Sequence, residues 1–105
     1  MDPATVVDRA DEVVLLDVRE PLEWQAGHVA GAQHLPMSQL GARQAEIPTS
    51  PPIVCVCRSG HRSAFVTQAL RQAGYEAHNL EGGLLAWLAA DLPLVTEDGR
   101  PGTVV

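Results

Sequence analysis

The segment that decides the fold is residues 53–74, IVCVCRSGHRSAFVTQALRQAG. It opens with Ile53 to Val56, an apolar run rich in branched residues, which is typical of a strand buried on both faces. From Arg62 onward apolar residues recur at helical spacing, and Gly74 ends the pattern. The residues predicted to form the apolar face of this helix are Phe65, Val66, Ala69, Leu70 and Ala73, with Thr67, Gln68, Arg71 and Gln72 opposite. The segment therefore predicts a buried strand, a short loop and a helix.

Similar units lie on both sides of this segment. Asp2 and Pro3 predict the cap and the first residue of a helix that runs to about Ala10. Further strands are predicted at residues 13–16, 31–35 and 76–80, and further helices at 21–26, 38–46 and 84–90, of which 38–46 is weak. Strands that alternate with helices at such short spacings predict an α/β fold, a twisted parallel sheet with helices on both faces.

The end of the chain has a different composition. From Leu92 onward the sequence is rich in Pro, Gly and acidic residues, which predicts a loose tail. The 105 residues are enough for one compact domain. We expect a folded domain over residues 1–93 and a C-terminal tail over residues 94–105.

Charge and cysteine content narrow the classes of function. The net charge is −6 and there is no lysine, so we expect neither nucleic acid nor an anionic membrane surface as a partner. No export signal and no run of about twenty apolar residues is found. Cys55 and Cys57 are too close in one strand for an unstrained disulfide, which favours free thiols in the cytoplasm. The histidines and cysteines lack metal-ligand spacing, so no metal and no cofactor is expected.

The strand ends predict where the chemistry lies. Parallel strands end at one rim, which would collect Asp17, Cys57 and the segment 81–83, and open α/β sheets bind ligands there. Cys57 also precedes the N-terminus of the helix predicted from Arg62 to Ala73 and lies close to Arg58 and Arg62. The positive end of the helix dipole and the two arginines favour a thiolate over a thiol there. Cys57 is therefore predicted to be a nucleophile.

The neighbours of Cys57 suggest an anion-binding loop. Ser59 and Gly60 are small enough for successive backbone N–H groups to converge on one point. Asp17 is expected to orient an arginine of this loop, although it could instead cap the helix that starts at Pro21. His61 is taken as a contributor to the loop, with a histidine pointing to water as an equal alternative.

Other residues have simpler interpretations. Cys55 lies within a strand and is expected only to pack. Trp24 and Trp87 could line a cleft, but in so small a domain the sequence favours the core for both.

Four segments together resemble the rhodanese-like domain family. They are CRSGHRS at residues 57–63, LLDVRE at 15–20, EPLEWQAGHVAGAQHLP at 20–36 and LEGGLLAW at 80–87. The resemblance implies a sulfurtransferase in which Cys57 takes the outer sulfur of thiosulfate as a persulfide and passes it to cyanide or a thiol. It also implies that the loop from Cys57 to Arg62 holds the persulfide, that Arg58 and Arg62 attract the anionic donor, and that Asp17 and Arg19 support the loop. The donor or acceptor could also be another protein's persulfide.

The resemblance has two departures and leaves two other functions open. Many relatives have a short strand before the first helix, so the sheet is expected to lack one edge strand or to have it at Val6 or later; Cys55 is outside the family's pattern. A non-catalytic interaction module is one alternative, but such modules usually lack the cysteine. A phosphatase or arsenate reductase is the other, but its loop in this family is one residue longer, whereas four residues separate Cys57 from Arg62 here.

Overall fold

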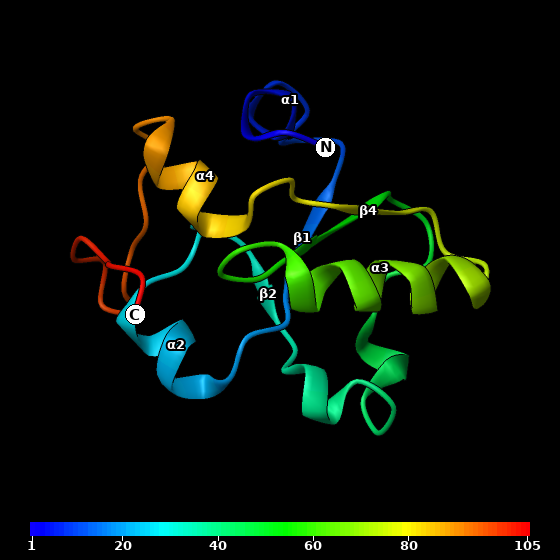
Figure 1. Ribbon diagram of the computed structural model, residues 1–105. Helices are drawn as coiled ribbons and strands as arrows, with labels where there is room; N and C mark the ends of the chain where they lie inside the picture. Colours follow the sequence, from blue (N-terminus) through cyan, green and yellow to red (C-terminus); the bar gives the residue numbers. More distant parts are fainter.

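The protein forms one small α/β unit, seen in a computed structural model that describes residues 1–105 (Figure 1). The helices are α1 (Pro3–Asp8), α2 (Pro21–Ala26), α3 (His61–Gln72) and α4 (Gly83–Ala89), with 3-10 turns η1 (Met37–Gln39) and η2 (Gln44–Glu46). The strands are β1 (Val14–Asp17), β2 (Gln33–His34), β3 (Ile53–Val56) and β4 (Ala77–Asn79). None of the helices has the length and apolar character needed to cross a bilayer.

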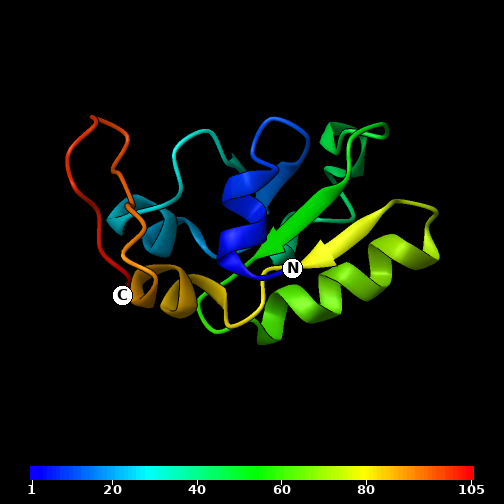
Figure 2. The ribbon, with the colours of Figure 1, turned by 90° about the horizontal axis from the view of Figure 1, so that it is seen from above.

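The four strands form one parallel sheet in the order β2-β1-β3-β4. Asp17 at the end of β1 lies opposite Val56 at the end of β3, so both strands end at one rim. Figure 2 shows β3 and β4 side by side and pointing the same way, toward the loop that precedes α3. The predicted fold class is confirmed.

Helices cover both faces of the sheet, and β3 shows how. Its residues alternate between two apolar cores and all four are buried. Ile53 and Cys55 join the core under α3, while Val54 and Val56 join the core under α1 and α4. A strand buried on both faces cannot alternate polar and apolar residues, which explains the continuous apolar run.

The buried face of α3 differs from the predicted one. Phe65 is 73% exposed. The buried residues are Ser63, Val66, Thr67 and Leu70. Thr67 tolerates burial because its hydroxyl donates to the carbonyl of Ser63 at 2.8 Å. The prediction is confirmed for Val66 and Leu70 and wrong for Phe65, Ala69 and Ala73. Hydrophobicity alone misplaced part of the face, because two hydroxyl side chains satisfy their hydrogen bonds inside.

The weak helix predicted at residues 38–46 is also wrong. The structure has the two short turns η1 and η2 in its place. Gly41 lies between the two turns, and a glycine within a short helix weakens it.

The expectation of a loose tail is wrong as well. Val95 and His28 exchange two backbone hydrogen bonds of 2.8 and 2.9 Å, and the N–H of Thr103 donates to Ala26 at 2.8 Å. Figure 1 shows the C-terminus beside α2. Gly27 permits this contact, because a Cβ atom there would lie 2.6 Å from the backbone of Thr103. Docking relies on backbone hydrogen bonds and a close glycine contact, which composition does not reveal. The division at residue 93 stays a prediction.

Within residues 1–105 no strand precedes α1, but Met1 makes strand-like hydrogen bonds beside the end of β4. The amino group of Met1 donates to the carbonyl of Asn79 at 2.8 Å, and its carbonyl accepts from Glu81 at 2.9 Å. These two bonds flank Leu80 as in a parallel ladder. The sheet has four strands, in line with the expected missing edge strand, and Val6 lies within α1.

Candidate active site

The start of α4 holds the loop after β3 through two backbone hydrogen bonds. The backbone N–H groups of Leu84 and Leu85 donate to the carbonyls of Cys57 and Arg58 at 2.9 and 3.0 Å. Gly83 allows this approach, because a Cβ atom on it would lie only 2.5 Å from the Arg58 carbonyl oxygen. The segment 81–83 and Cys57 therefore meet at one rim, as the strand order predicts.

The sulfur of Cys57 lies inside a ring of hydrogen-bond donors. Its side chain accepts from the N–H of Gly60 at 3.1 Å and from the N–H and hydroxyl of Ser63 at 3.4 and 3.2 Å. Gly60 has φ of +97°, a left-handed conformation that suits glycine. Cys57 itself is 1% exposed. Donors from both the loop and the first turn of α3 thus converge on one atom.

This environment favours the thiolate of Cys57. Burial is the largest influence and by itself raises the pKa, but hydrogen bonds from Ser63, Gly60 and Ser59 outweigh it, so the pKa falls below its ordinary value. Hydrogen bonds to the charged form stabilise it. The direction agrees with the prediction, and the main stabilising contacts are these donors.

Ser63 and Asn79, neither of them a predicted site residue, connect the Cys57 sulfur to the end of β4. The hydroxyl of Ser63 also lies 2.5 Å from Oδ1 of Asn79 at the end of β4, and Nδ2 of Asn79 donates to the Gly60 carbonyl at 3.0 Å. The sequence signals were that Ser63 is the last residue of the segment 57–63 and that Asn79 is the last residue but one of the strand predicted at 76–80. A position at the rim does not reveal a contact.

Asp17 does not pair with an arginine of the loop, contrary to expectation, nor does it cap α2. Both its carboxylate oxygens accept from Arg19, at 2.8 to 3.2 Å. Arg19 also donates to the carbonyls of Gly27 and Glu23, at 2.7 and 3.2 Å. Asp17 and Arg19 are 1% and 0% exposed. Arg19 thus ties the end of β1 to the middle of α2 and to its C-terminal cap Gly27. Asp17 needs no arginine of the loop, because Arg19 already supplies donors to both carboxylate oxygens.

The loop arginine Arg62 pairs with Glu23 of α2 instead. Two hydrogen bonds of 2.6 and 2.8 Å join the guanidinium to the two carboxylate oxygens. This contact is the main cause that holds the pKa of Glu23 below its ordinary value. Arg62 is therefore already paired, and the other arginine of the loop, Arg58, is exposed and makes no ion pair.

The remaining predicted residues lie at the surface or in the core. Ser59 and His61 are exposed. Cys55 is fully buried on the α3 side of the sheet, and burial raises the pKa of its thiol to about 11. This is the inert, packed environment expected for Cys55.

The two tryptophans differ from each other. Trp87 is buried in the core, as predicted. Trp24 is only half-buried, and its ring is stacked between the rings of His28 and His34, at centroid distances of 3.6 and 4.6 Å. Its indole N–H donates to Glu97 of the tail at 3.0 Å. Trp24 thus helps to dock the tail and is not a core residue.

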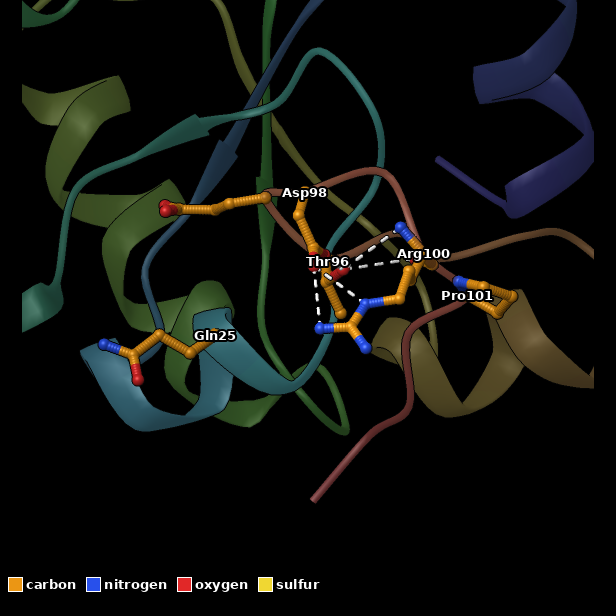
Figure 3. Close-up of a pocket in the computed structure, with 6 residues that line it drawn as sticks. Gln25, Thr96, Asp98, Arg100 and Pro101 are labelled. Atoms are coloured by element: carbon orange, nitrogen blue, oxygen red, sulfur yellow. Dashed lines mark hydrogen bonds and ion pairs between the residues drawn. The ribbon is translucent and has the colours of Figure 1, made fainter.

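The largest hollow on the protein lies away from the loop of residues 57–62. Gln25 of α2 lies on one side of it and residues 96–101 of the tail lie on the other, where Arg100 forms an ion pair with Asp98 and a hydrogen bond with Thr96 (Figure 3). The lining residues are Gln25, Thr96, Glu97, Asp98, Arg100 and Pro101. None of them is a predicted site residue, and an open polar surface without a nucleophile offers no chemistry comparable with that at Cys57.

Known proteins share both the sequence and the fold. The profile of the Rhodanese-like domain matches residues 3–90. An uncharacterized protein of Synechocystis is 43% identical over 96 residues, which cover 90% of this chain and 54% of that protein. A sulfurtransferase of Allochromatium vinosum is 40% identical over 90 residues, covering 85% of this chain and 84% of the relative. The chain thus spans about half the length of the Synechocystis relative.

A solved structure agrees with the sequence comparison. The crystal structure of a rhodanese-related protein from Thermoplasma volcanium superposes with a TM-score of 0.89 at 29% identity, covering 92% of this chain and 97% of that one. The chain belongs to the rhodanese-like domain family, and relatives with sulfurtransferase names lie within it.

Proposed function

We propose that this protein is a sulfurtransferase that carries sulfur as a persulfide on Cys57. The observation that carries the proposal is the ring of donors from Gly60 and Ser63 around the Cys57 sulfur. Such donors stabilise a charged sulfur, and a persulfide anion has the same charge as the thiolate that it replaces. A relative with a sulfurtransferase name supports the same class of reaction.

The reaction has two displacement steps. In the first, the Cys57 thiolate attacks the outer sulfur of thiosulfate, the bond between the two sulfur atoms of thiosulfate breaks, and its electron pair leaves with sulfite. In the second, cyanide or a thiolate attacks the outer sulfur of the persulfide, and the electron pair of the broken bond returns to Cys57. Charge is conserved in each step, and no metal or redox partner is needed.

The charged residues suggest how an anionic donor is attracted. Arg58 is the exposed, unpaired arginine of the loop, so we propose it as the first contact of the donor. Ser59, Gly60 and His61 would line the approach, with Gly60 contributing its N–H to the sulfur. Arg62 would take part only if the donor displaced Glu23.

The compartment and partners are proposed on the same basis. Both cysteines are free and buried, which is consistent with the reducing cytoplasm. The donor is proposed to be a small anion such as thiosulfate, and the acceptor cyanide or a thiol. A persulfide on another protein is a second source of the same sulfur chemistry.

The test is intact-protein mass spectrometry after incubation with thiosulfate. We expect a gain of about 32 Da, one sulfur atom, that cyanide or a reductant removes. Cys57→Ser is expected to gain nothing, while the matched variant Cys55→Ala, which changes the other buried thiol, keeps the adduct.

The alternative outcomes are distinct. No adduct on folded protein would exclude thiosulfate, and mercaptopyruvate and a protein persulfide would then be tried in turn; failure with all three would favour an interaction module. Hydrolysis of p-nitrophenyl phosphate that depends on Cys57 would instead support the phosphatase alternative.

A further inference from the structure

One hydroxyl group in the site has two acceptors. The Ser63 hydroxyl oxygen lies 3.2 Å from the sulfur of Cys57 and 2.5 Å from Oδ1 of Asn79. A serine hydroxyl carries a single proton, so it donates to only one of them at a time. Ser63 is fully buried, so bulk water does not compete for this proton.

The orientation of Asn79 is set by a third residue. Its Nδ2 donates to the carbonyl of Gly60 at 3.0 Å, which turns Oδ1 toward Ser63. The reversed amide would set two acceptor oxygens against each other at Gly60, so the hydrogen-bond network assigns this orientation. Asn79 therefore presents an acceptor to Ser63.

The charge of the sulfur decides which acceptor is better. A neutral thiol is a weak acceptor, so the Ser63 proton then favours the amide oxygen of Asn79. A thiolate is a strong, charged acceptor, so the proton then turns toward Cys57. The thiol proton leaves to solvent, and the serine proton rotates without leaving Ser63.

We propose that Asn79 is a positioning residue that holds the Ser63 proton while Cys57 is a thiol and so limits the fraction of thiolate. Removing Asn79 leaves the hydroxyl with no competing acceptor, which destabilises the thiol form relative to the thiolate. The proposal rests on the proposed function only in taking Cys57 as the reacting sulfur.

The test is the pH dependence of iodoacetamide alkylation of Cys57, followed by mass spectrometry. In Asn79→Ala we expect the pH midpoint of alkylation to fall. At a pH below the midpoint the fraction of Cys57 thiolate should then be about threefold higher, an effect typical of one hydrogen bond. In Ser63→Ala we expect the midpoint to rise by a similar factor. In the double variant the effect of Asn79→Ala is expected to vanish, because no hydroxyl remains to be held.

Controls separate this role from a structural one. Loosening of the loop would weaken the Gly60 donor and raise the midpoint in Asn79→Ala, so an unchanged or raised midpoint overturns the proposal. Persistence of the fall in the Ser63→Ala background also overturns it. His78→Ala, the preceding residue of β4, is expected to leave the midpoint unchanged.

A second variant covers a folding failure of Asn79→Ala. Asn79→Asp keeps the size and offers a stronger, charged acceptor, but it loses the donor to the Gly60 carbonyl. This loss and the direct effect of the charge on Cys57 are present with or without the Ser63 hydroxyl, so we expect the pH midpoint of alkylation to rise, and to rise less when Ser63 is alanine. An equal rise in both backgrounds contradicts the proposal. The alkylation uses no sulfur donor, so its outcome is independent of whether thiosulfate is a substrate.

Discussion

Replacing Arg19 by methionine tests whether the buried pair with Asp17 holds the rim together. The guanidinium makes every side-chain contact of the Asp17 carboxylate, and only the backbone N–H of residue 19, at 3.1 Å, remains as a donor once it is removed. The carbonyl of Gly27 also loses its donor at 2.7 Å. A buried charge left without its partner costs about 3–5 kcal/mol.

That loss is large for a domain of this size, whose stability is expected to be about 5–15 kcal/mol. With a urea dependence of about 2 kcal/mol per molar, the unfolding midpoint should fall by about 2 M. Asp17→Leu combined with Arg19→Met is expected to be less destabilised than Arg19→Met alone, because no charge is left unpaired. Arg43→Met, which removes an exposed ion pair with Glu46, is the control and should hardly move the midpoint.

A shift below about 0.5 M for Arg19→Met would refute this reasoning, since it would mean that the Asp17 carboxylate is satisfied without the guanidinium. A double variant less stable than Arg19→Met would do the same.

Three further predictions concern reactivity, the tail and the charge at the loop. Because the pKa of Cys57 is lowered and that of Cys55 is about 11, iodoacetamide at about pH 8 should modify only Cys57, and peptide mapping that finds equal modification would contradict this. Gly27→Ala should release the tail and abolish hydrogen-exchange protection of the residue 103 amide, since its Cβ would lie 2.6 Å from that backbone, whereas Gly41→Ala, with nothing within 4 Å, should not. Glu23→Gln frees Arg62, so the KM for thiosulfate, measured by thiocyanate formation, should fall several-fold while kcat changes little. An unchanged KM would show that Arg62 does not contact the donor.

Much of the fold could be predicted from local patterns. The bounds of β3 and α2 agree with the prediction, because a branched apolar run and a Pro-to-Gly segment are each complete signals within a few residues. The buried face of α3 could not be predicted in this way, since Phe65 is exposed and Thr67 is buried. Which face packs depends on the sheet beneath the helix and on the partners available to hydroxyl groups.

The candidate site also combines features that are local in the sequence with contacts that arise only from packing. The sequence by itself determined that Cys57 follows a buried strand and precedes a helix N-terminus, because strand, loop and helix are adjacent in the chain. Only the tertiary structure decided that Arg62 pairs with Glu23, 39 residues away, and that Asn79 reaches Ser63. Several carboxylates and amides lie in the predicted segments at the rim, and sequence spacing cannot say which of them comes within hydrogen-bond distance. That choice depends on how α2, α3 and β4 pack around the sheet.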